Sequence, residues 1–247
     1  RRLERLLESE EQVEKPRPVW QMKLAFDETP DSGRDVLLLR DLAMGYQGSP
    51  LFSGVNLTLR HGERIALLGV NGSGKTTLLR GIAGQIEPLA GQIRLGANVR
   101  LGYYSQEQEG LDEESNAFEE IQRVAPMGET EARSFLHYFL FSGDDVFVPV
   151  RSLSFGERAR LALAKLVASS CNLLLLDEPI NHLDIPSREQ FEHGLSAFEG
   201  TVVVVVHDRY FIERFATGLW SVERGSIRRY IDLAELRRGL GHGGSGP

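Results

Sequence analysis

The residues best suited to chemistry form one glycine-rich stretch, residues 69–76, with the order Gly-Val-Asn-Gly-Ser-Gly-Lys-Thr. An apolar run precedes it and a helix-forming segment follows it. The spacing G-x-x-x-x-G-K-[ST] between a strand and a helix is that of a phosphate-binding P-loop. Glycines let backbone N–H groups turn toward phosphate oxygens, and the positive end of the helix favours the same anions. A glycine-rich turn that binds nothing is the alternative, and this context argues against it.

Single positions in the loop have separate expected roles. Lys75 can reach the outer phosphates as a point charge, and the Thr76 hydroxyl can ligate Mg²⁺. The loop residues expected to bind a nucleotide are Gly69, Asn71, Gly72, Ser73, Gly74, Lys75, Thr76 and Thr77.

A pair of acidic residues, Asp177 and Glu178, directly follows the apolar run 173–176. In open α/β sheets, ligands bind beyond the carboxyl ends of the strands. We therefore expect Asp177 to hold Mg²⁺, directly or through water, and Glu178 to face the water that attacks the terminal phosphate. The alternative is a pair of surface acids after a buried strand.

Residues 153–157, Leu-Ser-Phe-Gly-Glu, open a predicted helix at 156–169. Ser154 and the free N–H groups of the helix start could bind an anion. A plain capping box, in which Ser154 caps the helix and Glu157 completes the box, is the simpler explanation for these residues taken alone. Their position shortly before Asp177 favours the anion site.

Composition limits the class of protein. A chain of 247 residues with 41% hydrophobic residues suits one large domain, or one domain with a small lobe. The net charge of −7 lacks the basic footprint of a nucleic-acid binder. Cys171 is the only cysteine, which excludes a disulfide framework and fits a reducing, cytoplasmic setting. The longest apolar runs are too short to cross a membrane, so no membrane partner is expected.

The remaining chain supplies the elements that position these residues. Strands are expected at 36–40, 55–60, 65–68, 91–95 and 99–104, with a turn-rich stretch at 41–50 and a helix at 75–84. Lys75 and Asp177 lie about 100 residues apart, more than one crossover requires. We therefore predict an inserted helical lobe at about 107–155, with helices at 117–124 and 129–141. Later elements are expected at 156–169, 173–176, 186–198, 202–206, 210–216, 219–222, 227–230 and 232–238.

The two ends differ from the middle in composition. Residues 1–18 are charged, with leucines at helical spacing, and end at prolines; they suggest the end of a longer helix in a fragment of a larger protein. Residues 19–35 suggest a linker. The Gly/Ser-rich tail 239–247 is expected to be disordered.

Together, the P-loop, the segment 153–157, the acids 177–178 and His207 resemble the nucleotide-binding domain of ATP-binding-cassette (ABC) proteins, over about residues 36–230. The whole ATPase domain is expected to span residues 36–238. The resemblance implies an α/β P-loop NTPase fold with a mixed sheet core, an antiparallel β layer and the inserted lobe. It implies that Tyr46 stacks on adenine, that Gln106 approaches Mg²⁺ and the attacking water, and that His207 contacts the γ-phosphate. A core or turn tyrosine is the alternative at position 46.

The resemblance also implies paired domains. Two domains of this class close head to tail, so Ser154, Gly156 and Glu157 would serve the ATP of a partner domain, and Asp184 in the D-loop would lie at their interface. The Asn-His-Leu-Asp sequence at 181–184, Glu157 and the His-Asp-Arg-Tyr-Phe sequence at 207–211 are most similar to the ABC-F subfamily. Residues 139–143 are typical of the second domain in that subfamily.

The implied function is Mg²⁺-dependent ATP hydrolysis by the C-terminal half of an ABC-F protein. Such proteins pair with an upstream nucleotide-binding domain and act at the ribosome (rRNA and tRNA), as translation factors or in antibiotic resistance. Three residues depart from the family pattern: Phe155, Ile180 and Val206. Phe155 puts the rate of hydrolysis in question. Two other functions stay open: the ATPase subunit of a membrane transporter, and a weakly hydrolysing module that uses ATP for dimerisation.

Overall fold

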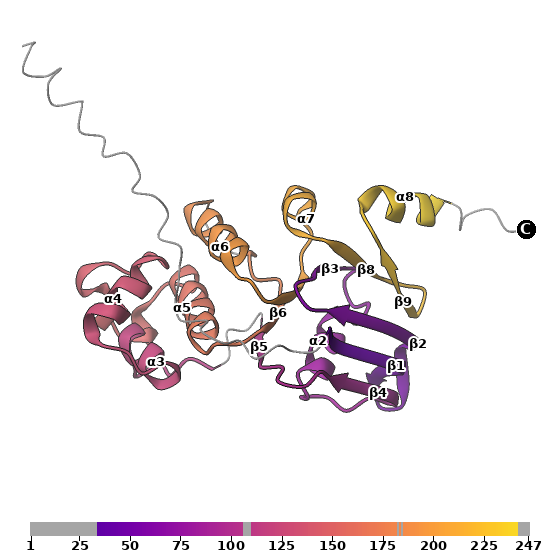
Figure 1. Ribbon diagram of the computed structural model, residues 1–247, viewed down its shortest axis with the longest axis horizontal. Helices are drawn as coiled ribbons and strands as arrows, with labels where there is room; N and C mark the ends of the chain where they lie inside the picture. Colours follow the sequence, from indigo (N-terminus) through magenta and orange to yellow (C-terminus); the bar gives the residue numbers. More distant parts are fainter. Residues whose placement is uncertain (1–33, 106–109, 182, 184, 242–247) are drawn as a thin grey trace, which may run out of the picture.

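Two β-sheets with a helix between them form one part of the fold, and a group of helices extends from one side (Figure 1). This computed structural model describes residues 34–105, 110–181, 183 and 185–241. The predicted helical end at 1–18, most of the linker 19–35 and residues 242–247 lie outside the described residues.

The smaller sheet is antiparallel, with β1 (Asp35–Tyr46) between β2 (Ser49–Arg60) and β4 (Ala90–Leu95). The prediction of a turn-rich stretch at 41–50 was wrong, because the turn comprises only residues 47 and 48. The strand continues past Asp41 through an irregularity in its pairing, at which Asp41 has a φ of 46°. The side chain of Asn56 on β2 pairs with Asp41, donating to its carboxylate at 2.9 Å and accepting from its backbone N–H at 3.0 Å. A bulge with its own polar partner therefore keeps the strand continuous.

The larger sheet has the strand order β5-β6-β7-β3-β8-β9. Its strands are β3 (Arg64–Leu68), β5 (Leu101–Tyr104), β6 (Leu173–Asp177), β7 (Thr201–Val205), β8 (Gly218–Glu223) and β9 (Ser226–Tyr230). All neighbours pair in parallel except β8 and β9, which form the predicted antiparallel hairpin. Every residue of β6 and β7 is buried, as their continuous apolar sequences predict for strands covered on both faces.

The two faces of the large sheet pack against different partners. Leu173 and Leu175 of β6 join a core that contains Leu78 and Leu79 of α2 (Lys75–Ile82) and the inner face of the antiparallel sheet. Leu174 and Leu176 instead join the second core, which contains residues of α5 (Phe155–Ala168), α6 (Ile185–Ala197) and α7 (Arg209–Phe215). This alternation follows from the period of two along a strand. It holds the P-loop helix between the two sheets.

The segment between β5 and α5 contains α3 (Ala117–Val124), α4 (Glu129–His137) and two short 3₁₀ helices, Gly143–Phe147 and Val150–Ser152. The helix predicted at 129–141 ends early, at His137. Leu140 has a φ of 62°; its N–H donates to His137 O, and the Phe141 N–H donates to Leu136 O. This pair of bonds is a Schellman motif, which closes the helix end with a left-handed residue.

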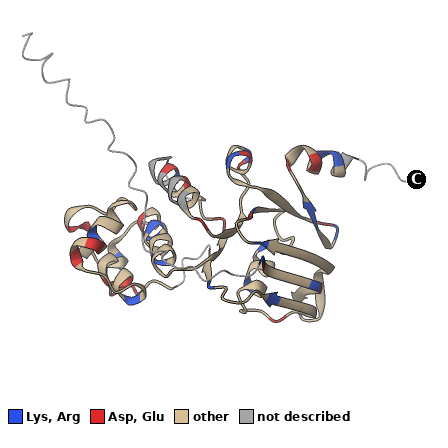
Figure 2. Ribbon diagram, viewed as in Figure 1, with Lys and Arg blue, Asp and Glu red and all other residues tan. Residues whose placement is uncertain are grey.

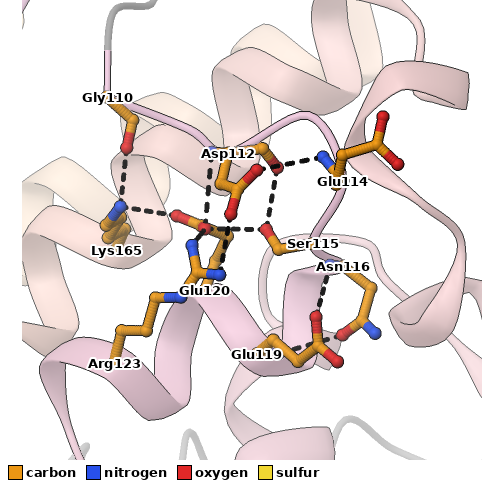
Figure 3. Close-up of polar contacts among 9 residues, drawn as sticks. All are labelled: Gly110, Asp112, Glu114, Ser115, Asn116, Glu119, Glu120, Arg123 and Lys165. Atoms are coloured by element: carbon orange, nitrogen blue, oxygen red, sulfur yellow. Dashed lines mark hydrogen bonds and ion pairs between the residues drawn. The ribbon is translucent and has the colours of Figure 1, made fainter.

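A buried ionic network ties this segment to α5 (Figure 3). The side chain of Glu120 is fully buried and accepts a hydrogen bond from Ser115 Oγ at 2.7 Å. Lys165 of α5 and Arg123 form ion pairs with the same carboxylate, and Lys165 also donates to Gly110 O at 2.6 Å. Because a buried charge that loses its partner is costly, this network fixes how α3 packs against α5.

The C-terminal helix, α8 (Leu233–Gly241), extends three residues beyond its predicted end at 238. The first residues of the predicted tail, 239–241, are therefore helical. Acidic and basic residues are interspersed along the helices of the described chain rather than gathered on one element (Figure 2). Within the described part of the chain, no helix is long and apolar enough to cross a membrane.

Candidate nucleotide-binding site

The P-loop connects β3 to α2 through glycines with unusual backbone angles. The φ values are 78° at Gly72 and 104° at Gly74, in the region that glycine tolerates best. A Cβ on Gly69 would lie 2.6 Å from Ser73 Oγ, so a larger residue would not fit without a shift. No side chain caps α2 at Gly74. The helix start can therefore present backbone N–H groups to an anion.

The side chain of Lys75 lies inside the loop, and the residue is only 6% exposed. Its Nζ donates to the carbonyl oxygens of Gly69 and Val70 at 2.9 and 3.1 Å. Burial lowers the pKa of Lys75, and the nearby carboxylates of Glu178 and Asp177 oppose that shift. The loop thus holds an ammonium group at its centre, where phosphate oxygens would be its natural counter-ions.

A cavity of about 470 Å³ opens over the loop. Its lining residues are Tyr46, Leu51, Asn71, Gly72, Gly74, Lys75, Thr76, Thr77 and Glu178. The Tyr46 hydroxyl lies 3.2 Å from Thr77 Oγ1, and Tyr46 is 51% exposed. The tyrosine is therefore not a core residue: its hydroxyl is tied to the P-loop helix at the rim of the cavity.

Asp177 ends β6 behind the loop and is 1% exposed. Neither of its carboxylate oxygens has a hydrogen-bond partner among the described residues. Burial raises the pKa of Asp177, and the neighbouring Thr76 hydroxyl opposes that rise. Unpartnered, buried oxygen ligands beside a hydroxyl fit a hard cation such as Mg²⁺, which prefers a few carboxylate and hydroxyl oxygens together with phosphate oxygens. The residues present therefore fit the implied metal.

Glu178 has a backbone φ of 50°, which is uncommon for a residue with a side chain. Its carboxylate lies between two polar side chains: Asn181 Nδ2 donates to Oε2 at 2.6 Å, and His207 Nε2 is 3.6 Å from Oε1. The backbone N–H of Glu178 donates to Val205 O at 3.2 Å, which fixes the strained turn against β7. The structure thus brings Glu178 and His207 together beside the P-loop cavity.

Ser154, Gly156 and Glu157 do not line this cavity. Ser154 caps α5 in a complete capping box: Ser154 N and Oγ donate to Glu157 Oε2 at 2.8 and 2.7 Å, and Glu157 N donates to Ser154 Oγ at 3.3 Å. These bonds from Ser154 lower the pKa of Glu157. Phe155, the first residue of α5, is 46% exposed.

Three predicted positions, Gln106, His182 and Asp184, lie outside the described residues. Two of the departures from the family pattern are buried, since Ile180 is 8% and Val206 is 2% exposed. Both belong to the core shared by α5, α6 and α7, where an apolar side chain packs well.

Sequence reasoning missed two contacts around the site. Asn181 was assigned only to the D-loop pattern, although its position three residues after Glu178 could have suggested a contact across a tight turn. The ion pair between Arg188 of α6 and Asp208, with 2.8 Å between Arg188 Nη2 and Asp208 Oδ2, spans 20 residues and has no local signal in the sequence.

Comparisons with known proteins agree with this fold. Residues 52–181, just over half of the chain, match the family model described as ABC transporter. ABC transporter F family member 5 of Arabidopsis thaliana is 40% identical over 233 residues, which cover 93% of this chain and 34% of that protein. Ribosome protection protein VmlR of Bacillus subtilis is 32% identical over 232 residues, which cover 94% of this chain and 42% of that protein. A solved structure of the ATP binding subunit of an ABC transporter has a TM-score of 0.72 at 22% identity, with 85% of this chain and 95% of that chain covered.

The fold is that of an ABC nucleotide-binding domain, which confirms the predicted mixed α/β fold class. The chain belongs to the ABC transporter family. The relatives named as ABC transporter F family members confirm the predicted resemblance to ABC-F proteins. The chain spans about a third to a half of the length of the curated relatives that it matches.

Proposed function

We propose that this chain binds ATP with Mg²⁺ and hydrolyses it. The observation that carries the proposal is the placement of an unpartnered, buried carboxylate, Asp177, behind a glycine loop that encloses the Lys75 ammonium group. Phosphoryl transfer needs charge neutralisation and positioning more than covalent chemistry, and these are what such a site provides. The bound cation would neutralise charge on the outer phosphates.

The protein side chains divide this work. Lys75 would exchange its two backbone carbonyl partners for phosphate oxygens, and Thr76 and Asp177 would hold the cation. Glu178 accepts a proton from, or orients, the attacking water, and Asn181 holds its second oxygen in place. His207, 3.6 Å from Glu178, contacts the terminal phosphate. Tyr46 stacks on the base at the open end of the cavity.

A second domain completes the site. Ser154 and Gly156 lie outside the cavity, and α5 begins with an exposed Phe155, so this end of the helix is available to the ATP of a partner domain. We propose an upstream nucleotide-binding domain of the same protein as that partner. This assignment rests on the family pattern, together with the fraction of the relatives' length that the chain covers.

The biological role that we propose is action on the ribosome, as the C-terminal half of an ABC-F protein. The support is the likeness to a protein named for ribosome protection and to several named ABC transporter F family members. An ATPase subunit of a membrane transporter and a dimerisation module remain the alternative functions. The exposed Phe155 at the start of α5 favours slow hydrolysis at the partner domain's ATP site, which this end of α5 would complete. The cytoplasmic location stays a prediction.

Calorimetry and phosphate release test this proposal together. The chain alone should bind ATP in the presence of Mg²⁺ but release phosphate slowly, because no second domain supplies the segment that corresponds to residues 153–157 of this chain. Joining it to an upstream domain should raise turnover per site. Failure of the chain to bind ATP would refute the nucleotide site, whereas full activity of a dilute, demonstrably monomeric chain would refute the two-domain mechanism.

A further inference from the structure

An ion pair outside the cavity joins α6 to the turn that carries His207. Arg188 Nη2 lies 2.8 Å from Asp208 Oδ2, and each side chain is 32% exposed. Asp208 directly follows His207, and its other oxygen accepts the backbone N–H of Phe211 at 2.8 Å, which caps α7. Two different elements therefore hold the two oxygens of one carboxylate.

The arginine is itself held in place. Arg188 Nε lies 2.9 Å from Glu192 Oε1, one turn further along α6. A planar guanidinium that binds two carboxylates loses most of its freedom. The helix that carries it is anchored by Phe191 and Leu195, which are 3% and 2% exposed. The ion pair therefore ties the His207 turn to a well-packed helix.

His207 needs such support. Its side chain is 49% exposed, so packing alone does not fix the imidazole ring at its distance of 3.6 Å from Glu178. The residue before it, Val206, is buried in the core, and the residue after it is Asp208. Buried packing thus holds the turn on one side of His207, and the Arg188–Asp208 pair holds it on the other.

We propose that Arg188 is a positioning residue that acts through Asp208 to hold His207 beside Glu178. The inference rests on the proposed ATPase function. Arg188 would touch neither nucleotide nor water, and its effect would reach the reaction only through the orientation of His207.

Four variants test the proposal. Arg188→Gln removes the ion pair, Asp208→Asn removes the charge but keeps an oxygen that can cap α7, and the double variant tests coupling. Arg188→Lys keeps the positive charge but loses the planar set of guanidinium donors. It should therefore lie between Arg188→Gln and the parent in both measurements. Arg133→Gln, in the exposed ion pair with Glu129 on α4, is the matched control for loss of a surface pair.

The first measurement is the NMR signal of the His207 ring in the nucleotide-free 247-residue chain, assigned with His207→Gln. Arg188→Gln and Asp208→Asn should shift or broaden this signal in the same way, and Arg133→Gln should leave it unchanged. The second measurement is turnover of the protein that contains both nucleotide-binding domains. The two variants should each lower kcat about 3- to 10-fold at nearly unchanged ATP affinity, and the double variant should be no slower than the worse single variant.

Two results would overturn the proposal. The first is a His207 signal and a kcat that match the parent in both Arg188→Gln and Asp208→Asn. The second is a double variant in which the losses of kcat from the two substitutions add. Thermal unfolding of each variant separates these effects from loss of the fold. If the parent itself does not hydrolyse ATP, the proposed function fails, and the His207 signal still decides whether Arg188 positions this side chain.

Discussion

Replacing Asp177 with Asn should have opposite effects on stability and on nucleotide binding. Asp177 is 1% exposed and its oxygens have no hydrogen-bond partner among the described residues, so the folded nucleotide-free protein buries a carboxylate that is only partly compensated. Such burial costs several kcal/mol, reduced here by the nearby Thr76, Arg80 and Lys75. A buried amide without partners costs about 1–3 kcal/mol. The variant should therefore be more stable than the parent by about 1–2 kcal/mol.

Calorimetry in the absence of Mg²⁺ and nucleotide measures this gain. At pH 7 the unfolding midpoint of Asp177→Asn should rise by about 2–4 °C for each kcal/mol. Asp144→Asn, which removes an exposed charge, is the matched control and should leave the midpoint unchanged. Because the folded pKa of Asp177 is raised, the parent loses stability as pH rises through that pKa. The advantage of the variant should therefore shrink as pH falls and the parent's carboxyl becomes protonated.

The same variant should lose the effect of Mg²⁺ on ATP binding, because an amide is a much poorer ligand for this cation than a carboxylate. An Asp177→Asn protein that is less stable than the parent without nucleotide, or that keeps the parent's Mg²⁺-dependent affinity, would refute this reasoning. Either result would mean that the buried carboxylate is structural.

Three further substitutions test separate parts of the site. Lys75→Ala should weaken ATP binding by about 10- to 100-fold, and equal affinities by calorimetry would contradict a phosphate contact. Tyr46→Ala should lose about 1–3 kcal/mol of ATP-binding free energy. Tyr46→Phe keeps the ring but not the contact with Thr77, and it should bind ATP nearly as the parent does. Weak ATP binding by Tyr46→Phe would assign the role of Tyr46 to its hydroxyl. Ser154→Ala should lower the free energy of unfolding by about 1 kcal/mol, because α5 loses its N-terminal cap. The ATP affinity of the isolated chain should stay unchanged. Weaker ATP binding would place Ser154 at this chain's own nucleotide site.

The parts of the site that could be predicted are local in sequence. The order strand, glycine loop and helix fixes Lys75 and Thr76 relative to one another within a few residues. Asp177 and Glu178 follow a run of four leucines, and the short length of this run favours a fully buried strand of a parallel sheet over a helix. Sheet topology then brings β3 and β6 to either side of β7, and their carboxyl ends to the same edge.

The parts that were missed depend on partners distant in sequence. The continuation of β1 through Asp41 requires Asn56, whose side chain satisfies the bulge. The burial of Glu120 requires Lys165, 45 residues away, and a glutamate on an exposed helix face has the same local pattern. The early end of α4 depends on Leu140 in a left-handed conformation, which its side chain does not suggest. The predictions of a turn-rich stretch at 41–50 and of a helix at 129–141 were wrong for these reasons.

The most direct test of the central claim is hydrolysis by Glu178→Gln in the protein that contains both nucleotide-binding domains. The amide keeps the shape of Glu178 but loses the charge that orients or accepts a proton from water. Turnover at this site should cease, while ATP stays bound and is recovered intact. Undiminished hydrolysis at the site formed by Lys75 would contradict the assignment of Glu178 and the mechanism built on it.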